Sequence, residues 1–323
     1  EIDLLSPLTI RGSTLRNRIV VSPMCQYCAK DGFADDWHLV HLGSRAVGGA
    51  GLVFTEATAV TAQGRISPGD LGLWKDEHIE PLSKIAAFIH RMGSVAGIQL
   101  AHAGRKGSCL TPWETRGKLI DKAKGGWTIV APSPIPFFPN DPAPQELTID
   151  GIKQVVADFI SAAKRALKAG FQVIEVHAAH GYLLHSFLSP LSNQRKDQYG
   201  GSLENRMRLL LEVVVELRKI VPEKMPLFVR ISATDWVDCG WDIEQSVKLV
   251  DALKGLGVDL IDVSSGGMAP HADIPVGPGY QVPFARRIRH DCSIMTGAVG
   301  LITEPHQAND VIISGAADLV FMA

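Results

Sequence analysis

Residues 171–182 read FQVIEVHAAHGY. The first half of this stretch is dominated by apolar and β-branched side chains, which predicts a buried strand. The second half places two imidazoles and a phenol, His177, His180 and Tyr182, directly after that strand. Polar side chains are costly to bury without a function, and barrel enzymes keep their catalytic groups at the carboxyl ends of their strands. The stretch therefore predicts one strand of a barrel and the location of its active site.

Similar apolar runs recur along the chain and are separated by segments with helical periodicity. The expected strands are Ile19–Pro23, Leu52–Ala59, Val95–Leu100, Val173–His177, Leu227–Ile231, Leu260–Val263, Ser293–Thr296 and Leu319–Met322. Apolar strands that alternate with amphipathic helices indicate parallel βα units covered on both faces. Eight such units predict an α/β fold, a (β/α)8 TIM barrel in which residues 1–323 form a single domain.

Capping residues mark the ends of several expected helices. Asp150 is expected to cap a helix that stops at Gly170, and Ser202 to cap the next one. Pro305 is expected in the first turn of a late helix with Thr303 as its cap.

Two irregular stretches are expected to form loops over the barrel mouth. Residues 106–145, after the third strand, are rich in Pro and Gly and hold Trp113 and Trp127 as a possible roof. This stretch is too long for an ordinary connection. Residues 265–281 form the second loop, and no eighth helix is expected before the printed residues end at Ala323.

The composition argues against several classes of protein. A net charge of −2 with interspersed signs gives no basic face for nucleic acid. No apolar run reaches the roughly 18 residues of a membrane span. The acidic opening Glu1–Asp3 does not resemble a signal peptide, and five scattered cysteines fit reduced thiols. A cytoplasmic protein is expected.

His177, His180 and Tyr182 allow more than one chemistry on their spacing alone. Two imidazole N–H groups can stabilise negative charge on a substrate oxygen, and a phenol can act as a general acid. Alternatively, the histidines are structural, bind zinc, or serve a metal-dependent or proton-transfer lyase or isomerase. Cys25-x-x-Cys28 and the pair His38 and His41 each supply only two ligands, so no metal site is expected.

Six blocks of the sequence, in order, resemble the Old Yellow Enzyme family of ene-reductases. The blocks are SPMCQY (22–27), EAT (56–58), QLAHAGRK (99–106), HAAHGY (177–182), YGGSLENR (199–206) and AVGLIT (298–303). Cys25 and Tyr27 are similar to the thermophilic-like or xenobiotic-reductase branch. The resemblance implies an FMN-dependent enzyme that uses NADPH or NADH. It also implies reduction of C=C bonds conjugated to carbonyl or nitro groups, by ping-pong hydride transfer through FMN.

The resemblance also implies roles for individual residues. His177 and His180 bind the activating group of the substrate, Tyr27 contacts the substrate, and Tyr182 donates the proton. The implied FMN-binding residues are Ser22, Pro23, Met24, Cys25, Ala57, Gln99, Arg230, Val299 and Gly300. Among these, Cys25 is expected to tune the flavin potential, and Val299 and Gly300 to cradle the phosphate. The family completes that phosphate site with a Gly–Arg or Ala–Arg pair after the eighth strand.

Other assignments stay open at this stage. Arg230 lies inside an apolar strand, so it needs an anionic partner, either reduced flavin or a core carboxylate such as Glu175 or Asp262. Residues 105–106 either meet the cofactor phosphate or the nicotinamide donor, or form a solvated basic pair. Asn205 and Arg206 are expected to form a helix-start network. A flavin-binding barrel without turnover is the remaining functional alternative. The expected partner is a small activated alkene, and a homo-oligomer is possible.

Overall fold

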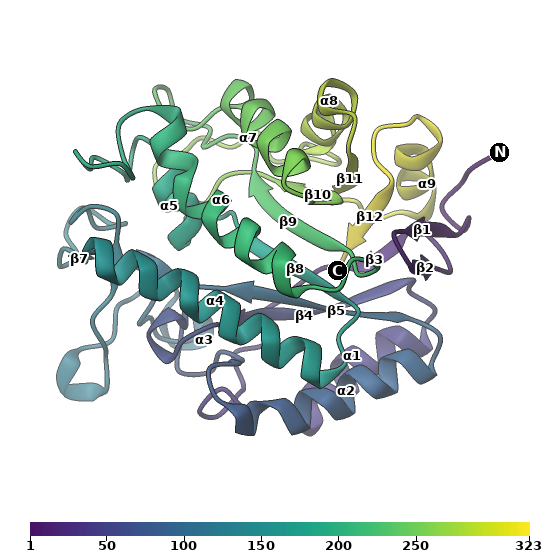
Figure 1. The fold of residues 1–323 in the computed structure, drawn as a ribbon, viewed down its shortest axis with the longest axis horizontal. Coiled ribbons are helices and arrows are strands. Elements are labelled where there is room, and N and C mark those ends of the chain that lie inside the picture. The colour runs from purple at the N-terminus through teal and green to yellow at the C-terminus, as the bar shows by residue number, and fades with distance from the viewer.

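The computed structural model describes residues 1–323 and contains a closed barrel of eight parallel strands (Figure 1). In order around the ring the strands are β3 (Ile19–Val21), β4 (Leu52–Ala59), β5 (Val95–Ala101), β8 (Val173–Ala178), β9 (Leu227–Ser232), β10 (Leu260–Ser264), β11 (Met295–Ala298) and β12 (Leu319–Met322). Strand β12 pairs with β3 and closes the ring. The expected α/β architecture, a (β/α)8 barrel, is confirmed, and every expected strand is present.

Helices cover the outer face of this barrel (Figure 1). They are α1 (Asp36–Val47), α2 (Ile79–Arg91), α4 (Ile149–Ala169), α6 (Leu203–Ile220), α7 (Ile243–Gly255), α8 (Val282–Cys292) and α9 (Pro305–Ile313). Strand β12 ends at Met322, one residue before the last residue of the printed sequence. No helix has both the length and the apolar character needed to cross a membrane.

Several helix ends differ from the expected ones by one or two residues. Helix α4 is capped by Thr148, whose hydroxyl accepts a hydrogen bond from the Gly151 N–H, so the expected cap Asp150 lies within the first turn instead. Strand β11 begins at Met295 rather than Ser293, because Ser293 adopts a left-handed conformation (φ 50°) that ends α8. In α9 the N-cap is Glu304 and not Thr303.

Other ends match the expectation. Ser202 accepts a hydrogen bond from the Asn205 N–H at the start of α6, and Pro305 opens α9. Asn205 Nδ2 also donates to the Gly200 carbonyl, and Arg206 Nε donates to that of Gly201, which confirms the helix-start network.

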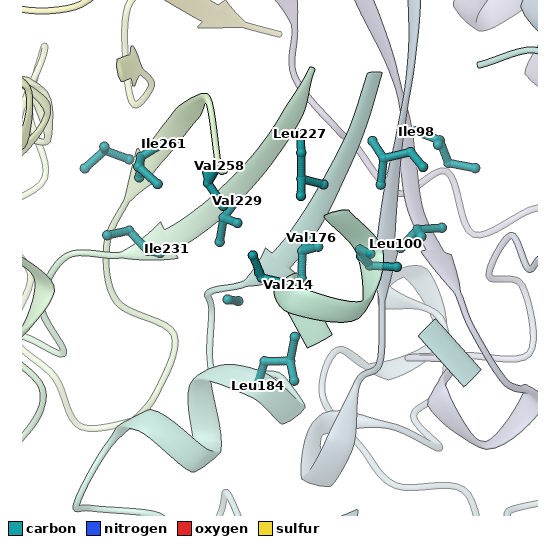
Figure 2. Close-up of a cluster of buried hydrophobic side chains, with 14 of the residues drawn as sticks. Ile98, Leu100, Val176, Leu184, Val214, Leu227, Val229, Ile231, Val258 and Ile261 are labelled. Atoms are coloured by element: carbon teal, nitrogen blue, oxygen red, sulfur yellow. The ribbon is translucent and has the colours of Figure 1, made fainter. Parts of the chain in front are cut away.

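Side chains alternate between the two faces of each strand, as the period of two requires. The outward-facing ones pack against the helices. Figure 2 shows Ile98, Leu100, Val176, Val229 and Ile231 of β5, β8 and β9 together with a residue of α6 in this outer layer. The inward-facing residues at the amino ends of the strands form a separate apolar cluster. Its strand members are Val20, Leu52, Phe54, Val95, Val173, Phe228, Leu260, Leu319 and Phe321.

An N-terminal hairpin closes the amino end of the barrel. Strands β1 (Leu8–Ile10) and β2 (Ser13–Leu15) are antiparallel and contribute Ile10 and Leu15 to the inner apolar cluster. The sequence analysis missed this hairpin, because each strand has only three residues and no periodicity can be recognised over so short a run.

Short elements lie in the loops at the opposite end of the barrel. They are η1 (Ala62–Gly64), η2 (Asp76–His78), η3 (Gly104–Lys106), α3 (Pro112–Thr115), η4 (Lys122–Lys124), β6 (Val130–Ala131), β7 (Gln145–Glu146) and α5 (Leu183–Leu188). In Figure 1 the arrowheads of β4 and β5 point toward β7, away from β1 and β2. The long excursion after the third barrel strand is thus confirmed.

Candidate active site

The three residues expected to be catalytic lie together at the carboxyl end of β8, His177 within the strand and His180 and Tyr182 just after it. The His177 ring centroid is 5.2 Å from that of His180 and 5.0 Å from that of Tyr182, and both ring pairs meet edge to face. A sharp reversal makes this possible, because His180 (φ 61°) and Gly181 (φ 76°) both have left-handed backbones. Gly181 also packs so closely on the Gly267 carbonyl that a β-carbon would collide with it. Glycine is therefore required at this turn.

Both histidines are held in the neutral form. Burial lowers the pKa of each ring well below the usual value, and the positive charge of Arg230 lowers both pKa values further. The Ala179 N–H donates to His177 Nδ1 at 3.3 Å, so a neutral His177 carries its hydrogen on Nε2. His180 Nε2 lies 2.7 Å from the Ser264 hydroxyl at the end of β10. The site thus presents neutral imidazoles rather than cations.

Tyr182 is a phenol that keeps its proton. Burial raises the pKa of Tyr182 well above its usual value, and the neighbouring Cys25 raises it further. The hydroxyl is therefore fully protonated at neutral pH, as a proton donor must be.

Arg105 and Lys106 are bonded to backbone carbonyls and do not form a solvated pair. Lys106 Nζ donates to the carbonyls of His180 (2.8 Å) and Gly267 (2.9 Å). The Arg105 guanidinium donates to backbone carbonyls, including that of Met268 at 2.8 Å. Burial lowers the pKa of Lys106 to about 8. The solvated pair is wrong, because these long cations serve as buried clamps that tie the loops after three strands together.

The loop after β3 places Cys25 and Tyr27 beside this cluster. The Glu56 carboxylate accepts a hydrogen bond from the Gln26 N–H at 3.1 Å, and Tyr27 has a left-handed backbone (φ 55°). Burial raises the pKa of the Cys25 thiol well above its usual value, and the nearby Asp70 raises it further, so the thiol is neutral. Strain at a functional loop of this kind persists only where neighbouring contacts enforce it.

Cys28 and His38 belong to the support of that loop. Cys28 Sγ lies 3.8 Å from His38 Nε2. His38 is buried, lies 3.4 Å from the Glu56 carboxylate and accepts the Asp35 N–H at the start of α1. The chain contains no group of three or more His, Cys, Asp or Glu side chains arranged to hold a metal ion.

A cavity of about 400 Å³ opens over Tyr27 and Tyr182. Phe137 and Phe138 of the long excursion form part of its wall. Trp113 and Trp127 do not form a roof over this cavity. Trp113 is 67% exposed and touches only the edge of Tyr27. The other, Trp127, donates its indole N–H to the Gln63 carbonyl. Neither indole lines the cavity, because the excursion folds so that its phenylalanines point inward.

Two of the expected flavin contacts, Gln99 and Arg230, lie within the barrel and are bonded to carboxylates. Gln99 Nε2 donates to Glu175 at 2.9 Å. Arg230 Nε donates to Asp262 at 2.5 Å, and its Nη2 donates to the Ser22 hydroxyl at 2.8 Å. The ion pair considered from the sequence is therefore present, while Arg230 also reaches the Ser22–Cys25 segment. Ala57 pairs with Gln99 across β4 and β5.

The loop after β11 has the form of an anion cradle. The backbone N–H groups of Val299, Gly300 and Leu301 donate no hydrogen bond within the protein, and Gly300 (φ 113°) and Leu301 (φ 48°) have positive φ. The Gln281 amide donates to the Val299 carbonyl at 2.9 Å and holds the loop in place. Successive free N–H groups of this kind bind phosphate. The residues present therefore fit the phosphate end of a nucleotide cofactor.

Comparison with known proteins identifies the family. The model of the NADH:flavin oxidoreductase / NADH oxidase family matches residues 3–323. The chain belongs to this family. The expected Old Yellow Enzyme relationship is thus confirmed, and the protein is a flavin oxidoreductase with FMN as cofactor and NAD(P)H as electron donor.

Individual members of the family align over nearly the whole chain. The NADPH dehydrogenase of Geobacillus sp. is 50% identical over 325 residues, covering 100% of this chain and 90% of that protein. The NADPH dehydrogenase of Bacillus subtilis is 49% identical over 321 residues, covering 99% and 89% respectively. The solved structure of the Old Yellow Enzyme homologue from Zymomonas mobilis superposes with a TM-score of 0.81 at 26% identity, over 99% of this chain and 88% of that one.

Some residues at the site escaped the sequence analysis. Ser232 and Ser264, which bond the His180 backbone and ring, end β9 and β10. Their signal was a polar residue at the carboxyl end of an apolar run, the same signal that marked His177. Phe137 and Phe138 carried no signal, because an irregular loop has no period from which an inward face can be read.

Proposed function

We propose that this flavin oxidoreductase reduces C=C bonds conjugated to a carbonyl or nitro group. The observation that carries the proposal is the cluster of two neutral imidazoles and one protonated phenol, with the phenol of Tyr182 lining the cavity. Neutral N–H donors stabilise a developing oxyanion, and a phenol that keeps its proton is a suitable acid for the adjacent carbon.

The proposed cofactor site uses residues from five strands and their loops. The Ser22–Cys25 segment would lie along the flavin, with Ala57, Gln99 and Arg230 at its pyrimidine edge. The free N–H groups at Val299 and Gly300 would hold the phosphate. FMN, when bound, accepts hydride from NAD(P)H and delivers hydride to the alkene in the second half of a ping-pong cycle.

The chain's own groups then act on the substrate. His177 Nε2–H donates a hydrogen bond to the carbonyl or nitro oxygen. His180 Nε2 gives up its hydrogen bond with Ser264 and donates to the same oxygen. Tyr182 donates its hydroxyl proton to the carbon next to that activating group. Tyr27 and Phe137 contact the remainder of the substrate and exclude water from the cavity.

Tyr182→Phe tests the assignment of the proton donor. Rapid mixing with NADPH should reduce the bound flavin at a rate within about twofold of wild type, whereas reoxidation by cyclohexenone should slow about 100-fold. Tyr199→Phe is the matched control. The Tyr199 hydroxyl donates a hydrogen bond of 3.0 Å to Glu212 and does not belong to the site. Equal losses in both half-reactions would remove Tyr182 from the role of proton donor. A wild-type protein that oxidises NADPH but transfers hydride to no enone or nitroalkene would reject the proposed substrate class.

A further inference from the structure

Four buried polar side chains form a layer across the barrel interior. Gln99 of β5, Glu175 of β8, Arg230 of β9 and Asp262 of β10 lie on four neighbouring strands and are each at most 5% exposed. Gln99 pairs in register with Glu175, and Arg230 with Asp262. The layer lies above the inner apolar cluster, two residues further along β8, β9 and β10 and four residues further along β5. At the amino end it is covered by that cluster, to which the hairpin contributes Ile10 and Leu15.

Charge in this layer does not balance if every group is ionised. Glu175 and Asp262 would carry two negative charges against the single positive charge of Arg230. The groups that act on Glu175 are Asp262, Arg230 and the amide of Gln99, and the ring of His177 above them is neutral. An uncompensated charge in a site without water is strongly unfavourable. One additional proton makes the layer neutral.

The hydrogen bonds identify where that proton belongs. One oxygen of each carboxyl is engaged, since Gln99 donates to Glu175 Oε2 and Arg230 donates to Asp262 Oδ2. The other oxygens, Glu175 Oε1 and Asp262 Oδ1, are both buried without any partner. The two carboxyl groups flank the same guanidinium nitrogen, since Arg230 Nε lies 2.5 Å from Asp262 Oδ2 and 3.8 Å from Glu175 Oε2. A proton between them turns one into a donor and the other into an acceptor.

Glu175 is the partner that carries the proton. Burial raises the pKa of Glu175 well above its usual value, and the adjacent Asp262 raises it further. Burial also raises the pKa of Asp262, but the Arg230 guanidinium opposes that rise. Asp262 therefore stays the ionised partner of Arg230.

We propose that Glu175 and Asp262 share one proton and, in that state, act as positioning residues for Gln99 and Arg230. Protonated Glu175 keeps Oε2 as an acceptor, so the Gln99 amide nitrogen faces Glu175 and its oxygen faces away. Ionised Asp262 holds the Arg230 guanidinium with Nη2 on Ser22. The positioning of Gln99 and Arg230 toward the flavin rests on the proposed function. The shared proton does not depend on it.

Infrared difference spectroscopy of the FMN-bound protein tests the shared proton. The difference between the spectra of wild type and Glu175→Gln at pH 7 should contain a protonated-carboxyl band, and the contribution of buried Asp70, whose pKa is raised to about 7, is common to both spectra and cancels. Glu212→Gln, at a carboxylate that accepts the Tyr199 hydroxyl, is the control that leaves the band in place. Asp262→Asn should also remove the band, because Glu175 then ionises to pair with Arg230. A difference spectrum without the band, or a band that survives Asp262→Asn unchanged, would overturn the proposal.

Flavin affinity tests the positioning role. Glu175→Gln should change the Kd for FMN less than about threefold, whereas Glu175→Leu, which removes the acceptor of Gln99, should weaken binding about tenfold. Equal FMN affinity in the two variants would overturn the positioning role. If Glu175→Leu does not fold, the infrared spectra of Glu175→Gln and Asp262→Asn still test the shared proton. Absence of alkene reduction by the wild type would reject the proposed function and leave the infrared result unaffected.

Discussion

The two halves of the barrel interior differ in kind although the same strands build both. At the amino ends, Val173, Phe228 and Leu260 of β8, β9 and β10 belong to an apolar cluster sealed by the hairpin. Two residues further along these strands, Glu175, Arg230 and Asp262 form a charged layer. Burial of apolar area stabilises the first half by about 25 cal/mol per Å². Burying the charged side chains of the second half costs free energy, and hydrogen bonds and ion pairs between these side chains offset that cost.

The comparison shows how this fold separates stability from chemistry. A side chain in the apolar half contributes through its volume and its contacts. A side chain in the charged half contributes only as long as its partners remain, because the loss of one leaves another buried without compensation. Substitutions in the two halves should therefore follow different rules.

The largest effect is expected in the apolar half. Phe228 is fully buried and its ring centroid lies 6.0 Å from that of Phe54. Phe228→Ala should lower the free energy of unfolding by about 4 kcal/mol through lost burial and a cavity, as measured by urea denaturation with FMN present. Phe138→Ala, at a residue 38% exposed, is the control and should cost less than about 1 kcal/mol. Similar losses of unfolding free energy in Phe228→Ala and Phe138→Ala would show that the inner apolar cluster contributes no more stability than the exposed loop does.

A smaller effect is expected from single changes in the charged half, with strong coupling between them. Asp262→Ala should cost about 2 kcal/mol, less than the 3–5 kcal/mol usual for breaking a buried pair, since Glu175 can ionise and replace the lost carboxylate. Adding Glu175→Gln to Asp262→Ala leaves Arg230 unpaired and should cost more than the sum of the two single changes. Strict additivity in denaturation measurements would contradict this coupling.

The smallest expected effect concerns Lys106, which bonds loop carbonyls above the charged half, and it depends on pH. The folded-state pKa of Lys106 is lowered to about 8, below its unfolded value, so the unfolded chain binds the extra proton between these two values. The contribution of Lys106 to stability, measured as the difference between wild type and Lys106→Met, should therefore rise with pH above 8 by about 1 kcal/mol per pH unit, until Lys106 also deprotonates in the unfolded chain. Denaturation curves of both proteins between pH 8 and 10 measure this difference. The exposed Lys118→Met is the control, and a difference between wild type and Lys106→Met that does not change with pH would contradict the lowered pKa of Lys106.

Much of the fold could be predicted because each barrel strand is an apolar run bounded by turn residues. The run 173–178 predicted its own strand almost to the residue, and Gly170 ended the preceding helix as expected. Failures occurred where no period exists. The hairpin 8–15 is too short to show one, and the excursion gave no indication that Phe137 rather than Trp113 faces the cavity.

The sequence by itself determined the eightfold βα alternation and the grouping of His177, His180 and Tyr182, because strand period and chain proximity are local properties. Only the tertiary structure decided which buried charges meet. Arg230 and Asp262 are 32 residues apart, and Lys106 reaches carbonyls 74 and 161 residues away. Such pairings arise only after the ring closes, because closure sets the register between strands and removes the water that would otherwise solvate each charge.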